Sequence, residues 1–189
     1  MNPKRNLMKL PHKILELPDH QKFVGVVGCR GAVSAKNLFQ TIVEAGKEHG
    51  VLLQAFDARA IAGPRHLVHA VTLCLAARER GKNIARTPEI DLLCWVAGEK
   101  QIEMAVRKVG VKSKSPIAIV AVGGEIEKIT SAMREIFMKS GLRADPEVVE
   151  MSQEKVAKIK KIFAITEAEL TTSIEKIVLE RIALLETLL

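Results

Sequence analysis

The sequence predicts an α/β (α+β) fold, with a small mixed sheet packed against a layer of about seven helices in a single domain. Three observations lead to this prediction. Short apolar runs occur at residues 23–29, 51–56 and 116–122, the first and last of them rich in β-branched residues, and such runs indicate strands. Longer segments with helical periodicity separate these runs. Strands that alternate with helices are typical of folds in which helices cover a sheet.

The length of 189 residues is enough to bury a core, and we expect one domain over residues 22–189. Residues 1–21 contain three prolines and several basic residues without a sustained period. We expect an irregular arm there, with an apolar contact at Leu10 or at Ile14–Leu15. This arm is either a disordered tail or a basic segment that touches a partner.

Capping residues mark the outer helices. Ser34 precedes a helical pattern that ends at Gly50, and a second pattern, residues 125–139, ends at Gly141. Ser152 begins another helix that reaches residues 162–163. Between these two helices we expect an edge strand around Val148–Val149.

The C-terminal part of the chain predicts a final helical segment. Thr166 and Glu169 have the spacing of a capping box that would open this segment. Its apolar stripe consists of Ile174, Ile177, Val178, Ile182, Leu185 and Leu188, flanked by Leu179 and Leu184. This stripe is wider than one buried face requires, so its surplus either docks on a partner or packs into the core.

The middle of the chain, residues 63–110, predicts three consecutive helices. The first, residues 63–80, is apolar on both sides, so we expect it to be sandwiched in the core. The second begins at Thr87-Pro88, a threonine N-cap followed by proline at the first helical position, and ends at Gly98. The third, residues 99–109, places Ile102, Ala105, Val106 and Val109 on one face.

The composition indicates a globular chain with a moderately basic surface. Hydrophobic residues make up 48%, charged residues 27%, and the net charge is +7, which permits a polyanionic partner without demonstrating one. Aromatic residues make up only 3%, so stacking platforms for single-stranded bases are scarce. The three cysteines are widely spaced among apolar neighbours, which favours buried thiols and a cytoplasmic location. No apolar run is long enough to cross a membrane, and we expect no membrane partner.

The sequence contains no credible catalytic constellation, and we expect no enzyme activity, cofactor or metal. The nucleophile-elbow, kinase and Walker motifs are absent, and the glycines of residues 25–31 lack the spacing of a phosphate loop. His66 and His69 share one helical face but have no third metal ligand nearby. We interpret Asp57, after a strand end, as a turn residue at a helix entry.

Cationic residues gather where the central helices begin and end. Arg59, Arg65 and His66 precede or open the first helix, and Lys100 and Gln101 open the third. The linker between the first two helices is surrounded by Arg78, Arg80, Lys82 and Arg86. Helix starts with nearby cations favour phosphate binding, and Gln101 suits a base edge or a ribose hydroxyl. Alternatively, these are ordinary exposed residues at helix ends.

With these residues identified, the chain resembles the Cgi-type small accessory subunits of the KEOPS complex, the PRPK-binding protein family. The resemblance rests on the order and spacing of several motifs between Phe23 and the C-terminus. They are Gly63-x-x-His66-Leu67-x-x-Ala70, Lys82-Asn83-Ile84-Ala85-Arg86, Ala97-Gly98-Glu99-Lys100-Gln101-Ile102 and Val178-Leu179-Glu180-Arg181-Ile182-Ala183-Leu184-Leu185. The family typically has Gly-Gln-Arg-Gln-Ile where this chain has Gly98-Glu99-Lys100-Gln101-Ile102. Lysine keeps the charge but loses the bidentate fork of arginine.

The resemblance implies a non-catalytic subunit for threonylcarbamoyl-adenosine modification of tRNA. Its partners would be the small atypical kinase/ATPase of the complex, indirectly the threonylcarbamoyl-transferase, and tRNA bound through its 3′ CCA end. The predicted RNA contacts are Arg59, Arg65, His66, Lys82, Asn83, Arg86, Gly98, Lys100 and Gln101. The predicted kinase contacts are Arg181, Leu184, Leu185 and Leu188. A protein-only adaptor that activates the kinase is the first alternative, and a small enzyme acting on a phosphorylated substrate is the second.

Overall fold

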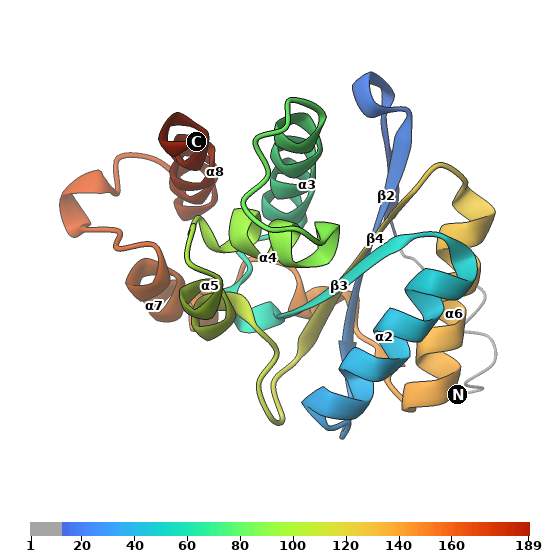
Figure 1. The fold of residues 1–189 in the computed structure, drawn as a ribbon. Helices are drawn as coiled ribbons and strands as arrows, with labels where there is room; N and C mark the ends of the chain where they lie inside the picture. Colours follow the sequence, from blue (N-terminus) through green and yellow to red (C-terminus); the bar gives the residue numbers. More distant parts are fainter. Residues whose placement is uncertain (1–12) are drawn as a thin grey trace.

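The computed structural model describes residues 13–189, which form an antiparallel sheet covered by helices on both faces (Figure 1). The strand order is β1-β2-β4-β3, with β5 beside β2, and every pair is antiparallel. The strands are β1 (Lys13–Leu17), β2 (Lys22–Arg30), β3 (Leu52–Asp57), β4 (Ile117–Gly123) and β5 (Arg143–Ala144). This confirms the predicted class; no parallel pair occurs among the described strands.

Two helical layers enclose the sheet. Helices α2 (Ala35–His49) and α6 (Ile126–Ser140) lie side by side on one face (Figure 1). The other face is covered by α3 (Pro64–Glu79) and α4 (Pro88–Ala97), and α8 (Ile174–Leu184), which packs against α3, lies farther out with α5 (Ile102–Val109) and α7 (Gln153–Ile162). None of the described helices is both long and apolar enough to span a membrane.

Strand β4 separates the two halves of the core. All seven of its residues are buried, as its continuous β-branched run predicts. Val120 and Val122 pack with the α3, α4 and α8 side, whereas Ile117 and Ile119 pack with the α2 and α6 side. This alternation follows from the two-residue side-chain period of a strand.

Several helix ends agree with the sequence signals. Ser34 caps α2 by accepting a hydrogen bond from the Asn37 N–H (3.1 Å), and Gly50 ends the helix with φ of 64°. Thr87 is the N-cap residue of α4 with Pro88 next, although its hydroxyl makes no capping bond. Helix α3 is sandwiched in the core, as expected.

The N-terminal segment departs from the expected irregular arm. Residues 13–17 form β1, which pairs with β2, and a 3-10 turn, η1 (Pro18–His20), connects the two strands. The apolar contact predicted at Ile14–Leu15 thus lies within a strand, while Leu10 falls outside the described residues.

The prediction of an edge strand around Val148–Val149 is wrong. Val148 is the last residue of a 3-10 turn, η3 (Pro146–Val148), Val149 follows it, and the short edge strand β5 lies a few residues earlier. Pro146 lacks an N–H for strand pairing, and both valines are buried against the core instead. The close approach of this segment explains Gly28 in β2, because a Cβ there would lie 2.4 Å from the Asp145 carbonyl oxygen.

Two expectations about the other helices also need correction. The final segment is not continuous, because a separate 3-10 turn, η4 (Glu167–Glu169), bears the Thr166 capping box and Ser173 caps α8. A last 3-10 turn, η5 (Leu185–Leu188), follows α8. On α5 only Ala105 and Val109 are buried, while Ile102 and Val106 stay 44% and 48% exposed, because the helix packs through one narrow side.

Candidate functional site

Helices α3 and α8 run in the same direction, and ion pairs join them at both ends. At their starts, Arg65 lies 3.8 Å from Glu175. At their other ends, Arg80 pairs with Glu186 of η5. The C-terminal part of the chain therefore lies along α3, beside the linker that leaves it (Figure 1).

A buried carboxylate holds this linker, residues 82–86, in one conformation. One oxygen of Asp91 (Oδ1) accepts hydrogen bonds from the Ile84 N–H (2.9 Å) and the Ala85 N–H (3.3 Å). The other oxygen (Oδ2) accepts from Nη1 of Arg78 (2.9 Å) and from Sγ of Cys74 (3.7 Å). Asp91 has no exposed surface, so these groups replace the water that a carboxylate otherwise requires.

Arg78 completes the network from the other side of the linker. Its guanidinium donates to the carbonyls of Ala85 (3.1 Å) and Arg86 (3.3 Å), as well as to Asp91. Arg78 is therefore a support for the backbone rather than a free cation. Among the described residues, the side chains of Lys82 and Arg86 form no ion pair and both are exposed.

The junction between α4 and α5 supplies the second group of candidate residues. Gly98 ends α4 in the left-handed conformation (φ 58°), which favours glycine. Glu99 accepts hydrogen bonds from the Gln101 N–H (3.2 Å) and from Nζ of Lys108 (3.1 Å). Partial burial raises the pKa of Glu99, but these hydrogen bonds outweigh it, so the pKa lies below its usual range. Glu99 thus pairs with Lys108, and it does not neutralise Lys100.

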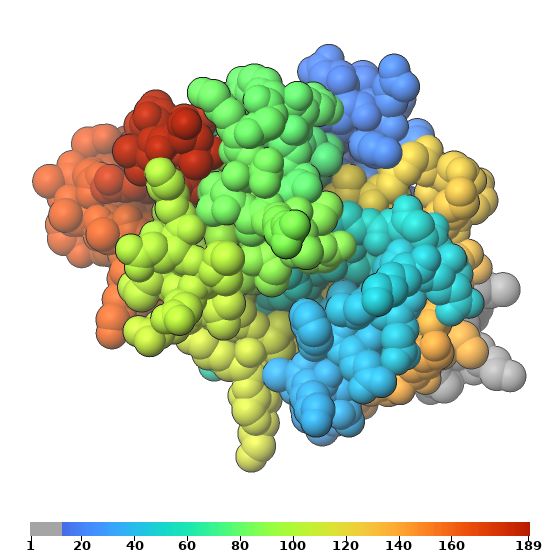
Figure 2. Space-filling model, in the orientation of Figure 1, coloured from blue at the N-terminus to red at the C-terminus, as the bar shows by residue number. Residues whose placement is uncertain are grey.

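Lys100 connects this junction to the C-terminal turn η5. Its Nζ donates to the Leu188 carbonyl oxygen (2.7 Å). In Figure 2 the yellow-green atoms of this region lie against the red atoms of the C-terminal segment, next to the green of α3. The structure therefore brings the predicted contacts at Gly98, Lys100 and Gln101 next to the predicted kinase contacts.

The predicted kinase contacts have different surroundings. Leu184 and Leu188 are 54% and 63% exposed, whereas Leu185 is buried in the core, which corrects the expectation for that residue. Its position after α8 turns it inward, opposite to its neighbour Leu184. Arg181 is partly exposed and pairs with Glu169 of η4.

The prediction that His66 contacts RNA also needs correction, because this side chain lies in the core rather than at the surface. Its Nδ1 accepts from the Ala62 N–H (3.2 Å), and its Nε2 lies 2.9 Å from the Val96 carbonyl oxygen, which assigns the proton to Nε2. Burial lowers the pKa of His66 to about 4. A neutral, fully buried imidazole with both nitrogens bonded cannot contact RNA or a metal, so His66 leaves the set of candidates.

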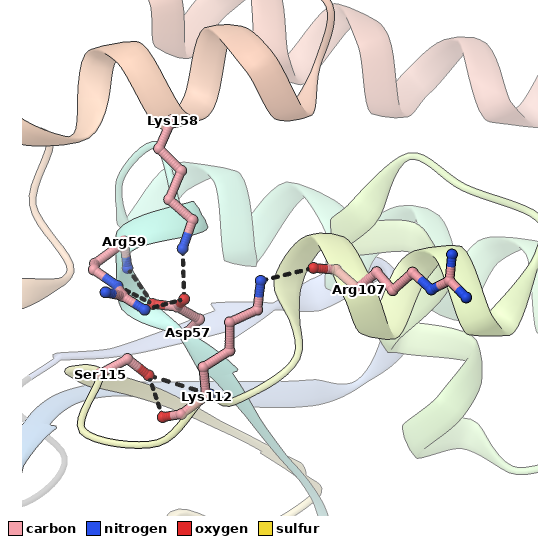
Figure 3. Close-up of polar contacts among 6 residues, drawn as sticks. All are labelled: Asp57, Arg59, Arg107, Lys112, Ser115 and Lys158. Carbon is pink, nitrogen blue, oxygen red and sulfur yellow. Dashed lines mark hydrogen bonds and ion pairs between the residues drawn. The ribbon is translucent and has the colours of Figure 1, made fainter.

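Arg59 lies in a different place from the linker. It precedes α3, and the 16 residues of that helix extend about 24 Å towards Arg80. Figure 3 shows its guanidinium against Asp57, with Nε–Oδ1 and Nη2–Oδ2 distances of 3.0 Å, and Lys158 on the same carboxylate (2.6 Å). Asp57 also accepts from the Arg59 N–H (3.1 Å), which confirms its expected role as a turn residue.

Burial of Asp57 alone would raise its pKa, but the hydrogen bonds from Arg59 and Lys158 keep the pKa below its usual value. In the same view, Nζ of Lys112 donates to the Arg107 carbonyl (2.9 Å). Arg59 therefore belongs to a structural ion-pair cluster. The structure separates it from Lys82 and Arg86, and Arg65 also lies at the far end of α3.

Metal-ligating groups offer no clear centre in the described part of the chain. One cluster, formed by Glu48, His49 and Glu135, has its ligand atoms within 4.8 Å of one another. His49 already lies 2.8 Å from Glu135, and the same carboxylate accepts from Lys139 (2.6 Å). These contacts are those of a surface ion-pair group.

Sequence reasoning did not identify the role of Asp91. The available signal was an acidic residue that directly separates the apolar residues Ile90 and Leu92 in a mostly apolar helix. An acid at such a position needs donors, and the nearest donors along the chain are the N–H groups of the preceding linker. The pairing of Arg80 with Glu186 had no local signal, because 106 residues separate them.

Comparisons with known proteins bear on this geometry. A search among curated proteins found no significant match. A family model described as kinase binding protein CGI-121 matches residues 32–186, which include the linker, the α4–α5 junction and the exposed leucine of α8. This match extends over nearly all the described helices, and it agrees with the motifs that connect α3, α4 and α8. The chain belongs to the family of kinase binding protein CGI-121.

Proposed function

We propose that this chain is a non-catalytic subunit of a KEOPS-type assembly that binds its atypical kinase and recruits tRNA through the 3′ CCA end. The observation that supports this most is the arrangement around η5. Exposed apolar residues on the C-terminal segment adjoin cations from two separate junctions, at Arg80 and at Lys100. A protein partner and a polyanion could therefore be held side by side.

The RNA part of the proposal depends on the fixed linker and on the α4–α5 junction. Lys82 and Arg86 are presented to solvent by a backbone that Asp91 and Arg78 hold in place. Lys100 and Gln101 are exposed at the neighbouring junction. Single-stranded RNA ends offer phosphates, 2′-hydroxyls and unpaired base edges, which suit such short, rigid polar segments better than a groove-reading helix.

The kinase part depends on Leu184 and Leu188. Both are more than half exposed, at the end of α8 and in the turn that follows it, whereas Ile177, Val178 and Ile182 of the same helix are buried. Exposed apolar side chains at such a position favour contact with a protein partner. Arg181, one turn before Leu184, would lie at the edge of that contact.

Titration of the chain with unmodified tRNA across a salt series tests the RNA part. Lys100→Ala combined with Arg86→Ala should weaken binding about ten-fold at low salt and reduce the slope of log K against log salt by about 2. Lys36→Ala combined with Lys47→Ala is the matched control, because both are exposed cations on α2, across the sheet. Equal losses in the two double variants would show that binding follows net charge alone.

Co-purification with the kinase tests the second part. Leu184→Glu should weaken kinase binding about 30-fold, since the new charge would be buried at the interface. Met138→Glu, at an exposed position on α6, is the control. If kinase binding persists in Leu184→Glu, the contact lies elsewhere; if kinase binds and tRNA does not bind at any salt, the chain is a protein-only adaptor.

A further inference from the structure

The C-terminal turn η5 (Leu185–Leu188) lies across two cations that come from different parts of the chain. The Glu186 carboxylate pairs with the Arg80 guanidinium at the end of α3. The Leu188 carbonyl accepts from Nζ of Lys100 at the α4–α5 junction (2.7 Å). Both cations belong to the proposed RNA surface. Arg80 has an ion-pair partner and Lys100 a carbonyl partner, whereas the side chains of Lys82 and Arg86 have no ion-pair partner among the described residues.

The turn is fixed in this position rather than free to swing. Leu185 is buried in the core that also contains Val178 and Ile182 of α8. The Thr187 hydroxyl donates to the Leu184 carbonyl (2.7 Å), which closes the turn on the helix end. The Arg80–Glu186 pair nevertheless remains open to solvent, with side chains 50% and 38% exposed. A phosphate could therefore reach Arg80 and compete with Glu186.

We infer that η5 is an internal mask of the RNA surface, with Glu186 as the competitor of RNA phosphate for Arg80. The inference depends on the proposed function, because it concerns the affinity of that same surface. Glu186 occupies the donors that a phosphate would use, and its charge repels the phosphate. An exposed ion pair is weak, so the mask should lower affinity by about two- to five-fold rather than abolish binding.

The same turn indicates what removes the mask. Leu184 and Leu188, the proposed kinase contacts, flank Glu186 in the chain and are exposed beside it. A kinase that packs on both leucines and provides a cation for Glu186 releases Arg80 towards RNA. Binding of kinase and of tRNA is then positively coupled, and by linkage tRNA strengthens kinase binding by the same factor.

The test is fluorescence anisotropy with a labelled, unmodified tRNA transcript at about 50 mM salt, where phosphate contacts are strong. Glu186→Gln should raise tRNA affinity by about two- to five-fold. Glu180→Gln is the matched control, since it removes the same charge from an exposed position on α8 that has no ion pair among the described residues. An equal gain in both variants, or none in Glu186→Gln, overturns the mask.

Arg80→Ala identifies the partner through which Glu186 acts. In an Arg80→Ala background, Glu186→Gln should have a smaller effect than in the wild type, which a double-mutant cycle measures. An undiminished effect in that background contradicts competition for Arg80. If the wild-type chain does not bind tRNA at all, the proposed RNA function itself fails and the mask fails with it.

The kinase of the same assembly tests the release. With saturating kinase, wild type and Glu186→Gln should bind tRNA with similar affinity, because Glu186 no longer competes for Arg80 in the wild type. The ratio of these two tRNA affinities is insensitive to any direct contact between the kinase and tRNA, because such a contact contributes equally to both. If the ratio stays at its value without kinase, docking does not release Arg80.

Discussion

Removal of the Asp91 carboxylate should destabilise the protein strongly and release the basic linker. In Asp91→Ala, the N–H groups of Ile84 and Ala85 lose their acceptor, and Arg78 loses its counter-ion inside the structure. An unpaired buried N–H costs about 1–3 kcal/mol, and breaking a buried ion pair costs about 3–5 kcal/mol. These costs overlap because the groups form one network, so we expect a loss of about 3–5 kcal/mol.

Asp91→Asn separates the contribution of charge from that of hydrogen bonding. The amide oxygen can still accept from the linker N–H groups, but Arg78 then has no charged partner. We expect a loss of about 1.5–3 kcal/mol, smaller than for alanine. Glu103→Ala, an exposed carboxylate on α5, is the control and should change stability by less than about 0.5 kcal/mol.

Urea unfolding followed by the fluorescence of Trp95, the only tryptophan, gives these free energies. This side chain is fully buried, so unfolding exposes it to water. A loss below about 1 kcal/mol in Asp91→Ala would refute the account of the linker. Loss of the acceptor for both N–H groups should also release the linker in Asp91→Ala, so the tRNA affinity of that variant should fall further than that of Asp91→Asn, while its kinase affinity is retained.

Three further predictions concern buried groups. The pKa of His66 is about 4 in the folded chain and about 6.5 in the unfolded chain, so unfolding takes up a proton between these pH values. The free energy of unfolding should therefore fall by about 3 kcal/mol as the pH drops from 7 to 4. A flat pH dependence of urea unfolding would contradict this. Gly28→Ala should cost about 1–3 kcal/mol by the same assay, because its Cβ would meet the Asp145 carbonyl. The three thiols should react with a disulfide reagent only after unfolding, since all three are buried. Burial also raises the pKa of Cys29 to about 12 and that of Cys94 to about 11. Rapid reaction of the native chain would contradict this expectation.

Local signals in the sequence predicted most of the elements. Ser34 with Gly50, and Thr87 with Pro88, mark helix ends through capping and backbone geometry that depend only on nearby residues. The run at residues 116–122 predicts a central strand, observed at Ile117–Gly123, because apolar residues on both faces require cover on both faces.

The departures have a common physical cause, which is contact between distant parts of the chain. Residues 13–17 lack a clear alternation, yet they form a strand because β2 offers an edge for pairing. Val106 has the spacing of a buried helix position but stays exposed, since none of residues 13–189 covers that side of α5. Tertiary contacts of this kind override a local pattern.

The candidate site was predictable in part. The sequence places cations at helix junctions, but it does not show that Arg80 and Lys100 meet the same turn. Nor does it distinguish the exposed Leu184 from the buried Leu185, since both belong to a stripe wider than one helical face. His66 appeared as a junction residue, and only its two backbone partners identify it as part of the core.

The most direct test of the account compares the affinity of the chain for intact tRNA with its affinity for the same tRNA lacking the 3′ CCA end. If the chain recruits tRNA through its 3′ end, removal of that end weakens binding at least about ten-fold, or about 1.4 kcal/mol. The double variant Lys100→Ala/Arg86→Ala should lose most of this difference, because it lacks the contacts that hold the end. Equal affinities of the wild-type chain for the two RNAs would contradict recruitment of tRNA through its 3′ end.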